Sequence, residues 1–109
     1  EMMGGRLSCV VDARAVPVLP GAWEAADACL YTAAGQRNRN HTGPFVRFEN
    51  VPFPMEEILF DPQTSGGLLL AAAPQKAEAL AEELWAAGLP AAIVGEIRDA
   101  QSTEITVKY

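Results

Sequence analysis

The stretch DPQTSGGLLLAAA, residues 61–73, joins seven turn-forming or polar residues directly to six apolar ones. Such a change of composition is typical of a tight loop that leads into a buried strand. Pro62 fixes its own φ angle and donates no backbone hydrogen bond, and Gly66 and Gly67 allow backbone conformations that other residues avoid. Because the apolar run does not alternate with polar residues, the sequence predicts a central strand at 67–73, covered on both faces.

Hydrophobic patterning predicts the other elements around this strand. A short helix follows Gly21 and ends before Gly35, a helical turn begins at Pro54, and a longer helix spans 74–87. Three further main strands are expected at 6–12, 91–97 and 104–108, the last two as an antiparallel hairpin. Residues 36–54 are expected to form an irregular loop that carries a short edge strand at 45–49.

This order of elements predicts an α+β fold. About four main strands and three helices around one sheet give a layered α/β sandwich of ferredoxin-like type. The opening residues EMMGG are typical of the last turn of a helix with a glycine stop, so we expect residues 1–109 to be one domain from a longer protein, with its first helix largely missing. Loss of that helix is expected to expose an apolar face of the sheet, which would favour self-association.

The composition limits the partners of this domain. Its 109 residues are half apolar and one-fifth charged, which is typical of a globular domain. The formal net charge of −6 argues against nucleic acid, since phosphate contacts need clustered basic residues and the cluster at 37–39 is too short. No apolar run is long enough to span a bilayer, so we expect no membrane partner.

The titratable residues predict neither a metal site nor a catalytic group in this chain. Cys9 and Cys29 are isolated from each other and from the single histidine, His41, so they are expected to be reduced thiols. The aspartates are scattered along the sequence, and helix capping or solvation explains each of them: Asp12, Asp27, Asp61 and Asp99.

The loop at 61–67 differs from the known phosphate-binding loops. Those loops precede a helix, whereas these glycines precede an expected strand, and the loop contains no lysine. A Walker-type site is therefore excluded. Two interpretations remain open: Gln63, Thr64, Ser65, Gly66 and Gly67 contact a phosphate or a neighbouring domain, or the two glycines only permit tight packing.

A second candidate site lies at Arg37 and Asn38. The guanidinium groups of Arg37 and Arg39 could clamp a phosphate, although solvation of these charges in a loop is the favoured interpretation. One hypothesis joins both candidates, with Arg37, Thr64 and Ser65 facing the same cleft.

The run from Asp61 to Gly67, followed by Leu68 and Leu69, resembles a signature of the selenophosphate synthetases (selenide, water dikinases), within the aminoimidazole ribonucleotide synthetase-like superfamily. Segments 16–22 and 35–38, the helix after Pro74 and the strand at 93–97 are similar to family segments in the same order. The resemblance thus covers nearly the whole chain and implies the C-terminal domain, whose layered α/β fold is related to the ferredoxin-like fold.

The resemblance implies a function in selenium metabolism. The full-length enzyme would convert ATP, selenide and water into selenophosphate, AMP and phosphate, with magnesium, as a cytoplasmic homodimer. The reactive cysteine or selenocysteine would lie in the N-terminal domain of the same chain, so the present domain is expected to be inactive alone and to hold no cofactor. Two alternatives are a non-catalytic ferredoxin-like module that binds a ligand or a partner, and a related ATP-dependent synthetase with another acceptor.

Overall fold

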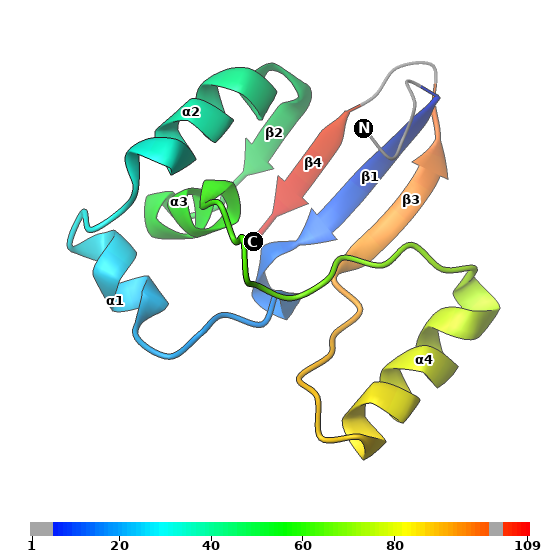
Figure 1. Cartoon of the computed structure of the whole chain (residues 1–109). Coiled ribbons are helices and arrows are strands. Elements are labelled where there is room, and N and C mark those ends of the chain that lie inside the picture. The colour runs from blue at the N-terminus through cyan, green and yellow to red at the C-terminus, as the bar shows by residue number, and fades with distance from the viewer. Residues whose placement is uncertain (1–5, 101–103) are drawn as a thin grey trace.

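The computed structural model describes residues 6–100 and 104–109, which form four α-helices and four strands (Figure 1). The helices are α1 (Ala22–Asp27), α2 (Ala33–Thr42), α3 (Phe53–Phe60) and α4 (Pro74–Ala86). The strands are β1 (Leu7–Asp12), β2 (Val46–Glu49), β3 (Gly95–Asp99) and β4 (Ile105–Lys108). Single 3₁₀ turns occupy Ala13–Ala15 and Gly43–Phe45. The predicted α+β class is confirmed, and the expected helix end at 1–5 lies outside the described residues.

The four strands form one mixed sheet in the order β2-β4-β1-β3. Strand β4 runs parallel to both β2 and β1, and β3 runs antiparallel to β1. The predicted hairpin of the last two strands is wrong, because β1 lies between β3 and β4. Strand β4 instead forms parallel ladders with β1, where Cys9 lies opposite Ile105, and with β2, where Val46 lies opposite Ile105. Residues 101–103 of the expected turn lie outside the described residues.

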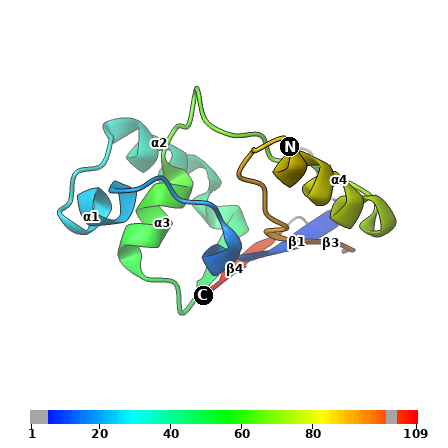
Figure 2. The ribbon, with the colours of Figure 1, turned by 90° about the horizontal axis from the view of Figure 1, so that it is seen from below.

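All four helices lie on one face of the sheet, so the domain has two layers (Figure 2). The centre of the core is formed by Ala13, Met55 of α3 and Val107 of β4. Val11, Phe48 and Ile105 pack against this centre from the covered face of the sheet, with further side chains from α3. The helix predicted from Pro54 is therefore confirmed, and its apolar side closes the core.

The open face of the sheet is polar. Residues that lie opposite each other in neighbouring strands share a face, so Arg47 and Thr106 point away from the core on which Val46 and Val107 pack. Charged side chains of β2, β4 and β3 line this face. On the helix side, where Ile97 of β3 lies opposite Cys9, the Ile97 side chain is 46% exposed, so the expected exposure of an apolar sheet face stays a prediction.

The apolar run at 67–73 forms no strand, and this prediction is wrong. Residues 67–73 form an extended connection to α4, and the side chains of Leu68, Leu69 and Leu70 are 87%, 68% and 56% exposed. Both inner positions of the sheet are filled by β4 and β1, whose ladders are complete on both sides. An apolar run indicates a preference for burial, but it forms a central strand only where a place in the sheet is free.

Residues 28–42 also differ from the prediction. Helix α1 ends at Asp27, and Cys29 follows with a φ of 60° in the left-handed region. Thr32 then starts α2, because its Oγ1 accepts a hydrogen bond from the backbone N–H of Gly35 at 3.0 Å. Most of α2 therefore lies inside the predicted irregular loop at 36–54, although the edge strand expected there is confirmed as β2.

Helix α4 matches its prediction closely. It begins at Pro74, and Gly88, with a φ of 76°, follows its end. Ala77, Leu80, Ala81 and Leu84 are its less exposed positions, as the predicted stripe requires. Within residues 6–100 and 104–109, no helix has the length and apolar character needed to cross a membrane.

Candidate functional site

The loop at 61–67 is fixed to α2 at its first residue. The Thr32 hydroxyl donates a hydrogen bond to Asp61 Oδ1 at 3.1 Å while accepting one from Gly35. The carboxylate of Asp61 thus lies at the N-terminus of α2, where the helix dipole favours a negative charge. Thr32 is the N-cap residue of α2, and Asp61 holds the Thr32 side chain in place.

Asn38 anchors the same loop from the middle of α2. Its Nδ2 donates to the carbonyl oxygen of Phe60 at 2.9 Å. That carbonyl belongs to the last turn of α3 and has no partner within its own helix. Asn38 therefore lies at the start of the loop, and part of its hydrogen-bonding capacity serves the packing of α2 on α3.

The turn inside the loop requires Gly66. The backbone N–H of Gly66 donates to Gln63 O at 3.0 Å, and a Cβ placed on Gly66 would lie 2.8 Å from the Cβ of Gln63. The packing interpretation of the glycines therefore fits Gly66. At Gly67 a Cβ would meet no atom within 4 Å, so this backbone is open to approach from outside.

Thr64 and Ser65 form the exposed tip of the loop. The side chain of Gln63 is turned back, with Nε2 donating to Ile58 O at 3.3 Å, and the Thr64 hydroxyl makes a long contact of 3.5 Å to Pro62 O. The loop thus presents two hydroxyl groups and the backbone of Gly67 to the outside, while Asp61 and Gln63 hold its base.

Arg37 is not brought to this loop. Successive residues of a helix are about 100° apart, so Arg37 lies about 200° from Gly35, which contacts the end of α3. Its side chain is exposed, whereas Gly35 is buried against Thr32 and Phe60. Among the predicted site residues, the structure therefore places Asn38 against the end of α3, just before the loop that carries Gln63, Thr64, Ser65, Gly66 and Gly67, and leaves Arg37 on the outer side of α2.

Arg39 makes a contact that the sequence did not predict. Its Nη1 lies 2.8 Å from Glu56 Oε2 and its Nη2 lies 2.7 Å from Glu57 Oε1, both on α3. Burial alone would lower the pKa of Arg39, but the hydrogen bonds and charges of Glu56 and Glu57 raise this pKa above its ordinary value. In the sequence, the only sign of this contact was the pair of adjacent glutamates, Glu56 and Glu57. In the structure, Glu57 faces the core and is 3% exposed.

The remaining titratable groups offer no catalytic centre in the described part of the chain. Burial raises the pKa of the Cys9 thiol, which makes it a weaker nucleophile at neutral pH. Cys29 is exposed in the turn after α1, and His41 lies in the last turn of α2. Within residues 6–100 and 104–109, no group of three or more His, Cys, Asp or Glu side chains could hold a metal ion.

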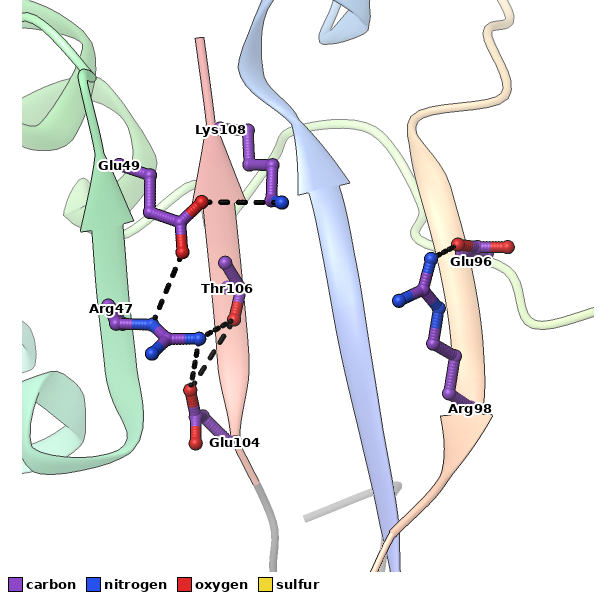
Figure 3. Close-up of polar contacts among 7 residues, drawn as sticks. All are labelled: Arg47, Glu49, Glu96, Arg98, Glu104, Thr106 and Lys108. Carbon is purple, nitrogen blue, oxygen red and sulfur yellow. Dashed lines mark hydrogen bonds and ion pairs between the residues drawn. The ribbon is translucent and has the colours of Figure 1, made fainter.

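A second polar cluster covers the open face of the sheet (Figure 3). Arg47 reaches Glu49 at 3.5 Å and Glu104 at 3.0 Å, and Lys108 lies 3.3 Å from Glu49. Arg98 pairs with Glu96 on β3. We call Arg47, Glu49, Glu104 and Lys108 the sheet ladder. Its two cations and two carboxylates balance, so it lacks the excess positive charge that an anion site needs.

Comparison with known proteins identifies the family. The model of the AIR synthase related protein, C-terminal domain, matches residues 1–108. The selenide, water dikinase of Agathobacter rectalis is 54% identical over 96 residues, which cover 87% of this chain and 28% of that protein. The enzyme of the same name from Desulfitobacterium hafniense strain Y51 is 40% identical over 108 residues, or 99% of this chain and 32% of that protein.

These matches confirm the resemblance to selenophosphate synthetases. The chain spans less than a third of the length of these curated relatives. The family model, by contrast, covers all but the last residue of the chain. The chain therefore belongs to the family of the AIR synthase related protein, C-terminal domain.

Proposed function

We propose that this chain is the C-terminal domain of an enzyme that converts ATP, selenide and water into selenophosphate, AMP and phosphate. The observation that carries the proposal is the 54% identity to a selenide, water dikinase over 87% of the chain. The loop at 61–67 supports it, because its base is fixed by Thr32 and Asn38 while the side chains of Thr64 and Ser65 at its tip are exposed.

In this proposal the chain supplies one wall of a cleft. The tip of the loop, with Thr64, Ser65 and the backbone of Gly67, would contact the phosphates of ATP or the neighbouring N-terminal domain. The described residues offer no carboxylate cluster, so magnesium and the reactive cysteine or selenocysteine would belong to the N-terminal domain of the same chain. The full enzyme would act as a cytoplasmic homodimer, and the present domain alone would be inactive.

Arg37 is a separate candidate contact for phosphate. It is exposed on the outer side of α2, so it would reach a ligand only from that side. In the full-length enzyme, Arg37→Ala is expected to raise the KM for ATP about tenfold, as loss of one charged contact does. An unchanged KM in steady-state assays would remove Arg37 from the site.

The test of the proposed function is the nucleotide product. Full-length protein incubated with ATP, selenide and Mg²⁺ is expected to form AMP only when selenide is present, as separated by ion-exchange chromatography. The 109-residue chain, under the same conditions, is expected to form none. ADP as the sole product would indicate a synthetase with another acceptor, and no nucleotide turnover by the full-length protein would indicate a binding module.

A further inference from the structure

Arg39 joins α2 to α3 through a two-pronged contact. Its two terminal nitrogens bind Glu56 and Glu57 at 2.8 and 2.7 Å, and its guanidinium carbon lies 4.7 Å from the centre of the Phe60 ring. A planar guanidinium that binds two carboxylates and stacks on a ring is fixed in both position and orientation. We call Arg39, Glu56, Glu57 and Phe60 the helix clamp.

The surroundings of the helix clamp make it stiff. The side chain of Glu57 is 2% exposed and that of Arg39 is 24% exposed. A buried carboxylate without its cation is costly, so few alternative arrangements compete with this one. Small displacements of α2 along α3 would have to break one of the two short contacts.

The same two helices hold the base of the loop at 61–67. Asn38, the neighbour of Arg39, binds the carbonyl oxygen of Phe60, and the ring of Phe60 lies under the guanidinium. Phe60 is the last residue of α3 and directly precedes Asp61, which Thr32 holds at the other end of α2. A shift of α2 relative to α3 would therefore move both anchors of the loop.

We propose that Arg39 is a positioning residue for the loop at 61–67. It fixes the direction in which Thr64 and Ser65 point, without itself touching the substrate. This inference rests on the proposed function, since it assumes that the loop contacts ATP or closes on it. In this role Arg39 acts through the geometry of its two terminal nitrogens, which bind two glutamates at once. A solvated or phosphate-binding arginine would act only through its charge.

The test, in the full-length enzyme, separates the effect of the positive charge of Arg39 from the effect of its planar geometry. Arg39→Lys keeps the positive charge but cannot bind both glutamates in one plane. We expect it to raise the KM for ATP about tenfold, with kcat changed less than about twofold, because misplacement of a binding loop acts on substrate binding. Arg47→Lys is the matched control, since Arg47 also holds two glutamates, and it is expected to leave KM and kcat unchanged.

A double variant shows whether Arg39 acts through the loop. Ser65→Ala removes one hydroxyl from the tip and is expected to raise the KM for ATP on its own. If Arg39 only positions the loop, Arg39→Lys combined with Ser65→Ala raises KM no more than the larger single effect, instead of by the product of both. Fully multiplicative effects would overturn the positioning role.

The remaining outcomes separate this inference from the proposed function. An unchanged KM in Arg39→Lys beside a raised KM in Ser65→Ala overturns the role of Arg39 and leaves the proposed function intact. Unchanged values in Ser65→Ala and Thr64→Ala remove the loop from ATP binding, and the inference falls with it. Should Arg39→Lys fail to fold, Glu56→Gln, which weakens the more exposed prong, takes its place with the same expected outcomes.

Discussion

Two arginines in this domain each hold two glutamates, and their surroundings differ. Arg39 in the helix clamp is 24% exposed and contacts a carboxylate that is 2% exposed, between two helices. Arg47 in the sheet ladder is 63% exposed and contacts carboxylates that are 37% and 46% exposed, on the open face of the sheet. The same chemical grouping is thus a fixed structural link in one region and a solvated surface network in the other.

This difference indicates that the helix clamp and the sheet ladder contribute unequally to the stability of the domain. Water already solvates the charges of the sheet ladder, so its ion pairs add little to stability. In the helix clamp water is largely excluded, and each partner depends on the other. The clamp lies next to the loop at 61–67, where the candidate functional residues gather, whereas the ladder lies on the opposite face of the sheet.

Among the substitutions that test this comparison, removal of the Arg39 side chain is expected to have the largest effect on stability. Arg39→Ala leaves the carboxylate of Glu57 buried without a cation, so we expect a loss of about 3–5 kcal/mol in the free energy of unfolding. Urea denaturation followed by circular dichroism measures it. A loss below about 1 kcal/mol would mean that the clamp is no stiffer than a surface pair.

Substitution of Gly66 and, separately, of Gly67 tests whether the loop at 61–67 is packed as tightly as the helix clamp beside it. A side chain at Gly66 would overlap Gln63, so Gly66→Ala is expected to cost about 1–3 kcal/mol. Gly67→Ala is the matched control, because its Cβ would meet open space, and it is expected to change stability by less than about 0.5 kcal/mol. Equal effects in thermal unfolding would contradict the tight turn from Gln63 to Gly66.

The sheet ladder is expected to give the smallest effect. Arg47→Ala removes two exposed ion pairs and should cost at most about 1 kcal/mol. Because exposed charges are screened, the cost should shrink in 0.5 M NaCl, while that of Arg39→Ala should change little. Chemical denaturation at both salt concentrations measures this, and a large, salt-independent cost for Arg47→Ala would remove the contrast between the two regions.

The sequence predicted those parts of the fold in which apolar side chains carry the packing. Strand β1, helix α3 and helix α4 each have an apolar pattern of the correct period, and their positions were predicted within a few residues. The general α+β class followed from these elements. The loop at 61–67 could be singled out because proline and glycine restrict or free the backbone wherever they occur.

Helix α2 could not be found in this way, because its packed side is polar. Gly35, Asn38 and Arg39 face α3, and their partners are backbone carbonyls and the carboxylates of Glu56 and Glu57. An analysis of hydrophobic periodicity does not detect a helix whose packed side is polar. Since Arg39 and Asn38 were expected in a loop, the helix clamp was also missed, and Arg37 was grouped with residues that lie on the other side of the helix.

The apolar run at 67–73 shows the opposite error. Three consecutive leucines predict burial, yet the prediction cannot tell which strand would pair with them. In the structure β1 and β4 fill the inner positions of the sheet, and Leu68 to Leu70 are left exposed. Composition therefore indicated that this segment prefers burial. The pairing of β1 with β4, which are distant in the sequence, left it outside the sheet.

The most direct test of the account is hydrogen–deuterium exchange of the full-length protein with and without a non-hydrolysable ATP analogue and Mg²⁺. If the loop at 61–67 belongs to the ATP site and the sheet ladder does not, peptides covering 61–67 become protected on addition of the nucleotide. Peptides covering β2 and β4 should exchange at unchanged rates. Unchanged exchange at 61–67, or protection confined to β2 and β4, would contradict the account.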